Sequence, residues 1–426
     1  MSHRQKFWGF IKDPLYGYVR LTSIERNVID TPAVQRLRRI RQLAGAEFVY
    51  PAANHTRFEH VVGAMYLAGV VTESIPVELS SEERQKVRLA ALLHDVGHAP
   101  FSHLFEPLLL KYLGRNHEDM SRWIIAESAL ADVIRGEGFD PKELSGLAVG
   151  KPEQGTRPFL GQIISGSFDV DKMDFVVRDS YHTGAGYGSV DVFRLIYTMD
   201  ILDGNLAVDV TALPTLESLI LARFESFRAI YFHRACRGVQ LMLLRALDAA
   251  RDDLQILEAK TPDEYLDWDD YTVWSKLRGN PHSREIINDI SARRLLKCAY
   301  EKTFYAKDEL VSSVFTNENV RVKLEEEIAS KAKVPAADVG IDVPSLPSVP
   351  YHYAMNIGPI EIPLFSKTRG GKKVPEKIGE ISKVVDVLQG FMNIIRVYTR
   401  ERYREQVSEA AEQVLGESPL SNVLSY

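Results

Sequence analysis

The sequence predicts a mainly α-helical protein that begins with a short β-hairpin and ends with an appended α+β region. Residues 7–21 mix aromatic and β-branched side chains around two turn signals, a pattern typical of a hairpin. From residue 31 onward, apolar residues recur every three or four positions, which predicts a series of helices around a core. Residues 215–254 are periodic throughout and predict either one long helix or two consecutive ones.

We expect two regions along the chain. Residues 1–255 contain the helical pattern and every candidate site residue. Residues 256–426 mix helical and strand patterns and contain no catalytic motif. Four segments of this second region have interpretable patterns: a strand at 354–365, a basic glycine-containing loop at 366–377, and helices at 379–391 and 398–415.

Composition excludes several classes of protein. The 426 residues are 45% hydrophobic and 26% charged, which is ordinary for a globular protein with a substantial core. The two cysteines, Cys236 and Cys298, are far apart, so neither a disulfide framework nor a thiolate zinc site is expected. We find no signal peptide and no membrane span, and therefore expect a cytoplasmic protein. The net charge of −6 argues against a protein whose whole surface binds nucleic acid, but it does not exclude a local basic cleft.

Histidines are unevenly distributed, which indicates a functional site. A functional role is favoured for His98, His103 and His117. For two others, a purely structural role is an equal alternative: His55 as a loop residue and His182 as a helix-end residue. Seven of the eleven histidines fall between residues 55 and 182: His55, His60, His94, His98, His103, His117 and His182.

Three separate segments offer metal-ligand side chains. His60 follows Arg57 by one helical turn, so both side chains share one helix face. His94 and Asp95 end an apolar run just before a glycine, where a helix terminus can direct two successive side chains into one cavity. Asp171 lies on a charged helix with its acidic and basic residues on adjoining faces.

Two imidazoles and two carboxylates suit manganese, iron, zinc, cobalt or nickel, and magnesium could join through substrate phosphates. Arg57 and Lys172 are natural partners for further phosphate oxygens. Taken alone, His60 is more simply a core histidine, and His94 with Asp95 a helix-end hydrogen bond. Together, however, the three segments would bury several unpaired charges unless a metal ion compensated them.

These motifs resemble a known family. The strings RFEHVVGAMYLAG, LLHDVGHAPFSH and FDVDKMDFVVRDSYHTG, preceded by VQRLRRIRQLAG, closely resemble the HD-domain deoxynucleoside triphosphate triphosphohydrolases, a branch of the HD superfamily of metal-dependent phosphohydrolases. The resemblance covers roughly residues 7–250 and implies an HD-domain helical core.

The resemblance also implies roles for individual residues. His98 and His103 match the paired histidines of the family, with His103 as the general acid near the leaving group. Glu106 and His117 would orient His103 or relay its proton. The metal ligands would be His60, His94, Asp95 and Asp171, and the phosphates would contact Arg57 and Lys172.

The nucleoside end of the site matches the family less well. Asp179 falls on the acid that binds the sugar 3′-hydroxyl, and Gln42 on the glutamine near sugar and base. Phe175 replaces a common tyrosine and lacks its hydroxyl. Arg228 matches a family arginine, but the expected aromatic platform for the base falls on Cys236.

Two further points stay open at this stage. Tyr231 or His233 could replace the missing aromatic platform. Asp30 and Arg38 match positions that bind an activating guanine nucleotide in some family members, yet they are equally explained as a capping acid and a helix-surface arginine.

Three functions are compatible with the sequence. The first is a triphosphohydrolase that cleaves a (d)NTP to nucleoside and triphosphate, with water attacking the α-phosphorus and a histidine protonating the departing oxygen. The second keeps the metal site but acts on a nucleoside monophosphate, a cyclic nucleotide, an alarmone or a nucleic-acid end. The third is a nucleotide-binding sensor with little turnover. The resemblance also implies a homo-oligomer, either dimer or tetramer.

Overall fold

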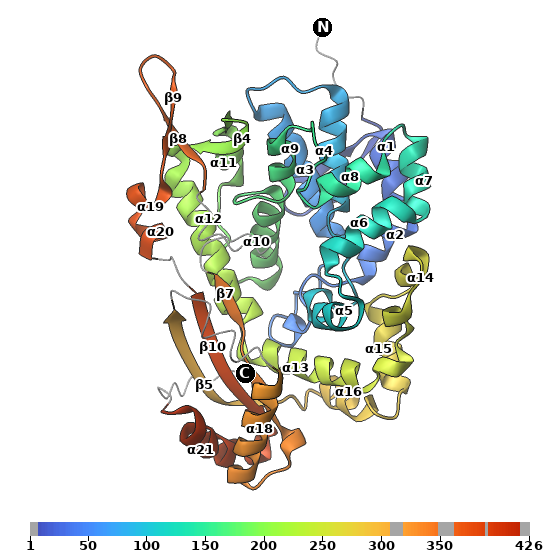
Figure 1. Cartoon of the computed structure of the whole chain (residues 1–426), viewed down its shortest axis with the longest axis vertical. Coiled ribbons are helices and arrows are strands. Elements are labelled where there is room, and N and C mark those ends of the chain that lie inside the picture. The colour runs from blue at the N-terminus through green and yellow to red at the C-terminus, as the bar shows by residue number, and fades with distance from the viewer. Residues whose placement is uncertain (1–6, 307–317, 348–361, 388–390, 418–426) are drawn as a thin grey trace.

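The computed structural model describes residues 7–306, 318–347, 362–387 and 391–417. Most of the secondary structure is helical, which confirms the mainly α-helical prediction. Figure 1 shows the N-terminal half as a body of packed helices, with strands β5, β7 and β10 at the end of the molecule far from the N-terminus. No helix in this described part of the chain is both long and apolar enough to cross a membrane.

The predicted hairpin opens the fold. Strands β1 (Gly9–Asp13) and β2 (Gly17–Leu21) pair antiparallel, with Asp13 opposite Gly17. The carboxylate of Asp13 accepts hydrogen bonds from the backbone N–H groups of Leu15 and Tyr16, which fixes the turn. Its other oxygen accepts a hydrogen bond from Arg178 at 3.0 Å, so the hairpin is tied to the helical core.

Helix α3 lies at the centre of the helical body. It begins with a capping box between Thr56 and Glu59, packs against both α4 and α10, and is therefore buried on nearly all sides. The helices after the hairpin are α1 (Ser23–Ile29), α2 (Pro32–Arg36), α3 (Arg57–Ser74), α4 (Ser81–Leu93), α5 (Glu106–Leu113), α6 (His117–Glu127), α7 (Ala129–Gly136), α8 (Pro141–Ala148), α9 (Pro158–Ile164), α10 (Val170–Thr183) and α11 (Val192–Tyr197).

The long periodic stretch forms two consecutive helices, α12 (Leu213–Ser226) and α13 (Arg234–Ala249), joined by a π-helical turn (Phe227–Tyr231). A π-turn widens the helix by one residue and is common at functional sites. The structure thus decides between the two alternatives that the sequence left open.

The main hydrophobic core continues beyond residue 255, where the sequence suggested a boundary. Tyr265, Val273 and Ile287 are fully buried in the same cluster as the residues of α3 and α4. The helices that bring these side chains to the core are α14 (Pro262–Leu266), α15 (Asp270–Gly279) and α16 (Arg284–Ser291).

Two small sheets lie in the remaining chain. In the first, β10 (Phe391–Thr399) pairs antiparallel with β5 (Lys297–Ala306), β6 (Val339–Asp342) and β7 (Ser345–Pro347), and α18 (Glu318–Ala332) and α21 (Arg404–Leu415) share a separate core with it. In the second, the order is β3 (Met199–Leu202), β4 (Asn205–Asp209), β8 (Leu364–Lys367) and β9 (Lys373–Glu376), with β4 and β8 parallel.

These elements test the predictions for the C-terminal segments. The predicted strand at 354–365 lies mostly outside the described residues, and only its last two residues fall in β8. The predicted loop at 366–377 is confirmed only in part: residues 368–372 form the turn of the β8–β9 hairpin, whereas residues 366–367 and 373–376 belong to its two strands. The segment at 379–391 contributes the short helices α19 (Ile378–Ile381) and α20 (Lys383–Val387), and the segment at 398–415 contains α21.

Close packing between α3 and α10 generates the first prediction. A Cβ added at Gly63 would lie 2.0 Å from Asp174 Oδ1 and 2.3 Å from Arg178 Nη2. Both side chains are buried and paired, so Gly63→Ala should lower the free energy of unfolding by about 1–3 kcal/mol in urea titrations. Gly136→Ala is the control, since nothing lies within 4 Å of its Cβ. An equal loss in both variants would contradict this account.

Candidate functional site

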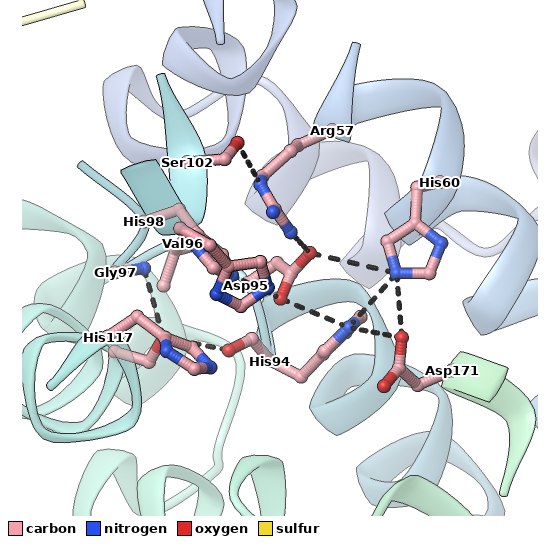
Figure 2. A network of polar contacts seen from close by, with 12 residues as sticks. Arg57, His60, His94, Asp95, Val96, Gly97, His98, Ser102, His117 and Asp171 are labelled. Carbon is pink, nitrogen blue, oxygen red and sulfur yellow. Dashed lines mark hydrogen bonds and ion pairs between the residues drawn. The ribbon is translucent and has the colours of Figure 1, made fainter. Parts of the chain in front are cut away.

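Four side chains from three helices converge on one point. His60 comes from α3, His94 is the C-terminal cap of α4 with Asp95 next to it, and Asp171 lies in the first turn of α10. His60 Nε2 lies 3.3 Å from His94 Nε2 and 3.1 Å from Asp171 Oδ1, and Asp95 Oδ1 lies 3.3 Å from His94 Nε2. Figure 2 shows all four side chains facing the same space.

The spacing of these donor atoms fits a transition-metal ion. Donors bound at about 2.1 Å in neighbouring coordination positions are roughly 3 Å apart, which is close to the observed separations. His60, His94 and Asp95 alone form a group that could hold one ion, and Asp171 Oδ1 lies within 3.7 Å of both imidazoles. The donor set of nitrogen and oxygen atoms suits the same metals that the sequence indicated.

Both imidazoles are oriented by hydrogen bonds at Nδ1, the ring nitrogen that points away from the centre. His60 Nδ1 lies 2.8 Å from Asp174 Oδ2, and His94 Nδ1 lies 2.8 Å from the Ala91 carbonyl oxygen. Since a carboxylate and a carbonyl oxygen can only accept, each Nδ1 carries a proton, and Nε2 is the atom that each ring would offer to a metal ion at the centre. Arg178 fixes Asp174 with two hydrogen bonds of 2.8 and 2.9 Å.

The carboxylates at the centre are held in their charged form. Burial alone would raise the pKa of Asp95, but Arg57 and His94 outweigh burial and keep that pKa well below its usual range. Burial is likewise outweighed at Asp171, where His60 and His94 keep the pKa well below its usual range. Both groups are therefore anionic at neutral pH and available to a cation.

A second cluster borders the first. His98 Nε2 lies 3.2 Å from Asp95 Oδ1, and the His98 ring stacks on His117 with centroids 4.3 Å apart. Glu106 accepts from His117 Nδ1 at 2.6 Å and from His103 Nδ1 at 2.9 Å. The Glu106 carboxylate therefore orients both imidazoles through Nδ1 and makes no bond to their Nε2 atoms.

The three imidazoles of this cluster differ in protonation. Burial and the positive charge of Arg57 hold the pKa of His98 well below its ordinary value. Desolvation by the surrounding protein also lowers the pKa of His103, despite its bond to Glu106 and although its side chain opens into a cavity. The pKa of His117, in contrast, is raised, because the effect of Glu106 outweighs that of burial. His117 is thus the histidine of the three that takes up a proton most readily.

His98, His103 and His117 also offer ligand atoms within 4.8 Å of one another. The rings of His98 and His117 are nearly parallel, at 13°. Lone pairs in the planes of two stacked rings cannot meet at one ion, so this geometry favours proton transfer over metal binding.

A cavity of about 590 Å³ joins the two clusters. Its size is in the range of sites that bind small molecules. The side chains of the two clusters form one end, and Phe227, Tyr231 and Cys236 form another part of the wall. The predicted site residues that line it are Gln42, Arg57, His94, Asp95, His98, His103, His117, Asp171, Lys172 and Phe175.

Asp179 and Arg228 do not line this cavity. Asp179 is fully buried, and its carboxylate accepts hydrogen bonds from Tyr231 Oη and, at 2.7 Å, from His55 Nε2. Arg228 is exposed and pairs with Glu225 at 3.1 Å. Of the two aromatic alternatives that the sequence left open, Tyr231 lines the cavity and His233 does not.

The remaining predicted cations have protein partners. Arg57 Nη1 lies 2.5 Å from Asp95, and its Nε donates to Ser102 Oγ at 2.7 Å. Lys172 Nζ lies 2.5 Å from Asp169 Oδ2 and donates to the Gly166 carbonyl oxygen at 3.0 Å.

Asp30 and Arg38 have the plain contacts that the sequence allowed. Asp30 caps α1 and pairs with Arg26 at 3.5 Å, and Arg38 lies over the ring of Phe58. Both residues are absent from the lining of the cavity.

Sequence reasoning missed two contributors, Asp174 and Arg223. Asp174 shares a helix face with Asp171, three residues earlier, and that spacing was the available signal. Arg223 lines the cavity from α12, and no sequence signal distinguished it from Arg228.

Comparison with known proteins agrees with this geometry. A family model described as the HD domain matches residues 57–145, and one described as the HD associated region matches residues 190–419. The chain belongs to the HD-domain phosphohydrolase family. This membership confirms the resemblance drawn from the motifs.

Several relatives of this HD-domain protein are known. It is 32% identical to the deoxynucleoside triphosphate triphosphohydrolase SAMHD1 homolog of Dictyostelium discoideum, over 67% of this chain and 59% of that protein. It is 30% identical to an uncharacterized protein of Methanocaldococcus jannaschii, over 72% of this chain and 63% of that protein. The chain thus spans less than two thirds of the length of these curated relatives.

Solved structures share the fold. A hypothetical protein from Aquifex aeolicus superposes with a TM-score of 0.76 at 28% identity and covers 94% of this chain and 99% of its own. A phosphohydrolase from Bacteroides thetaiotaomicron superposes with a TM-score of 0.70 at 22% identity, over 92% of this chain and 99% of that chain. The fold of these two solved structures therefore extends over nearly the whole of this chain.

The converging donor atoms generate the second prediction. His94→Ala or Asp95→Ala should abolish tight binding of a divalent metal, because each change removes one donor from the centre. Metal content after dialysis, measured by plasma mass spectrometry, checks this. His282→Ala is the matched control, since His282 is exposed and far along the chain from the site. Full metal content in the His94 and Asp95 variants would refute the ligand assignment.

Proposed function

We propose that the protein is a metal-dependent phosphohydrolase that cleaves a deoxynucleoside triphosphate into a nucleoside and triphosphate. The main support is that three of the four proposed metal ligands, His94, Asp95 and Asp171, line one cavity together with the imidazoles of His98, His103 and His117. Its volume of about 590 Å³ is large enough for a nucleotide. Several relatives are named deoxynucleoside triphosphate triphosphohydrolases, which supports the same substrate class.

In this proposal His60, His94, Asp95 and Asp171 hold the metal ion. Manganese, iron, zinc, cobalt and nickel suit these donors, and magnesium would bind with the substrate phosphates. The ion would supply a Lewis acid for the phosphate and lower the pKa of water. The hydrogen bond between His60 Nδ1 and Asp174 would keep the Nε2 atom of His60 directed at the ion.

His103 is the proposed general acid. Its side chain is 62% exposed, lines the cavity and is held at Nδ1 by Glu106, so its Nε2 can face a leaving group. A general acid must be protonated before it acts, and the lowered pKa of His103 works against this. Glu106 and His117 would relay the proton, because Glu106 binds both rings and His117 has the raised pKa, with its ring 5.1 Å from that of His103.

Arg57 and Lys172 are the proposed phosphate contacts. Each lies at the cavity wall and is already paired with an aspartate, so part of its charge is compensated. A phosphate would therefore share Arg57 with Asp95, and would draw Lys172 away from Asp169.

The sugar and base would occupy the part of the cavity near Gln42 and Phe175. We propose Asp179 as the acceptor for the 3′-hydroxyl, which requires the Tyr231 hydroxyl to move from its present bond with that carboxylate. Tyr231 stacks on Phe227 with centroids 4.7 Å apart, and this pair offers an aromatic platform for a base. Arg228, which resemblance assigned to the substrate, would have to turn inward from the surface.

A second candidate keeps the metal-dependent hydrolysis and changes the substrate to another nucleotide or phosphoester. Two observations at the nucleoside end of the site favour this second candidate. The carboxylate of Asp179 is already bound by Tyr231, and the side chain of Arg228 pairs with Glu225 at the surface. A nucleotide sensor with little turnover is favoured less, since binding alone does not need an oriented set of proton donors. We also propose a homo-oligomer, dimer or tetramer, on the resemblance alone.

Product analysis tests this proposal. Purified protein with manganese and each dNTP or NTP should release triphosphate as the inorganic product, because attack at the α-phosphorus separates the nucleoside from all three phosphates. Ion chromatography of the products checks this. Stepwise release of single phosphates would favour the second candidate, and tight nucleotide binding without turnover under every divalent metal would overturn both enzyme proposals.

The acid assignment generates the fourth prediction. His103→Gln should lower kcat by about 10²- to 10⁴-fold, the usual contribution of general acid catalysis, while metal content stays unchanged. Steady-state kinetics and metal analysis on the same preparation check this. Unaltered kcat in this variant, with a large loss in His117→Gln, would transfer the acid role to His117.

A further inference from the structure

The loop at residues 97–104 has an unusual backbone conformation. It contains His98 and His103, and between them Phe101 and Ser102 have φ angles of 61° and 58°. Two consecutive residues with a side chain in the left-handed region are strained, and such a conformation persists only where surrounding contacts enforce it. The contacts that hold this loop therefore also determine where His103 lies.

Asp270 binds this loop directly. Its Oδ1 accepts a hydrogen bond of 2.7 Å from the backbone N–H of Phe101, at the first strained position. Its Oδ2 accepts a hydrogen bond of 2.9 Å from the backbone N–H of Arg41, next to the cavity residue Gln42. Asp270 is only 7% exposed, and both of its oxygens are used by backbone donors from two different segments.

From this carboxylate a continuous chain of hydrogen bonds reaches the metal centre. Ser102 Oγ donates to the Arg41 carbonyl oxygen at 2.6 Å and accepts from Arg57 Nε at 2.7 Å. Arg57 Nη1 in turn binds the carboxylate of Asp95. Figure 2 shows Ser102, Arg57 and Asp95 in this order.

The helices beyond residue 255 hold the same loop at a second place. Tyr265 Oη donates to the Gly97 carbonyl oxygen at 2.9 Å. Arg36 bridges the two regions, because its Nη1 donates to the His98 carbonyl oxygen at 2.9 Å and its Nε to the Trp268 carbonyl oxygen at 2.6 Å. The segment that the sequence presented as an appendage without catalytic motifs thus contacts the backbone of the loop at several points.

We propose that Asp270 is a positioning residue for the active site: by binding the Phe101 and Arg41 amides together, it fixes the loop that directs His103 toward the metal centre. The inference rests on the proposed phosphohydrolase function. Burial raises the pKa of Asp270 to about 6, against the opposing effect of its two backbone donors and of Arg41 and Arg36, so the group is mainly a carboxylate at neutral pH.

Asp270→Asn is the decisive variant. An amide has one acceptor oxygen, so its NH₂ group would face either the Phe101 N–H or the Arg41 N–H, and that pair of donors would repel. Misplacement of a catalytic group by about 1 Å can cost on the order of 100-fold in rate. We expect kcat for dNTP hydrolysis with manganese to fall by about 10- to 100-fold, with KM and metal content little changed.

Asp269→Asn is the matched control. Asp269 precedes Asp270, caps the same helix by accepting from the Thr272 N–H at 2.9 Å, and pairs with Arg39, but it makes no hydrogen bond to the loop. It should lower the melting temperature and leave kcat unchanged. An equal loss of kcat in both variants, or none in Asp270→Asn, would overturn the inference while leaving the proposed function intact.

Hydrogen exchange supplies a readout that does not depend on turnover. Peptides covering residues 97–104 should exchange faster in Asp270→Asn than in Asp269→Asn, because the Phe101 amide loses its acceptor. If the wild-type protein hydrolyses no nucleotide, the proposed function fails and this comparison alone decides the positioning role, with equal exchange in the two variants refuting it.

A second variant applies if Asp270→Asn does not fold. Ser102→Ala removes the link from Arg41 to Arg57 one step further along the same chain of bonds. It should lower kcat with metal content retained. Full activity in Ser102→Ala would then count against the network.

Discussion

The buried carboxylate of Asp95 is the interaction on which the rest of the site depends. An ionised group buried away from water is stable only when opposite charges and hydrogen bonds compensate it. Arg57 binds one oxygen, and the imidazoles of His94 and His98 approach the other at 3.3 and 3.2 Å. Because these partners come from α3, from the end of α4 and from the following loop, one carboxylate fixes the relative position of the candidate metal centre and of the neighbouring histidine cluster.

The side chains around this centre are likewise fixed by buried ion pairs. Asp174 orients His60 and is itself neutralised by Arg178, which also binds Asp13 of the N-terminal hairpin. Asp270 also binds the backbone of the loop at residues 97–104, which contains His98 and His103. Elements that are remote in sequence and free of catalytic motifs therefore determine the geometry of the centre, because buried polar groups must each find a partner.

Local patterns predicted much of the fold. The hairpin, the helices of the first half and the periodic stretch at 215–254 were predicted because helix and strand periodicity is a local property of sequence. The loop predicted at 366–377 was correct only at its centre, because its outer residues form strands by pairing with each other, and such pairing leaves a weak local signal in a short basic segment.

The sequence by itself determined the family and the candidate donor set His60, His94, Asp95 and Asp171, because adjacent and helically spaced ligands leave a compact motif. Only the tertiary structure decided which side chains reach the cavity around that set. Resemblance assigned Arg228 to the substrate, but in the structure Arg228 lies in the π-helical turn at 227–231 and its side chain is exposed. The bond between Tyr231 and Asp179 and the hold of Asp270 on the loop are likewise long-range contacts, which no local pattern encodes.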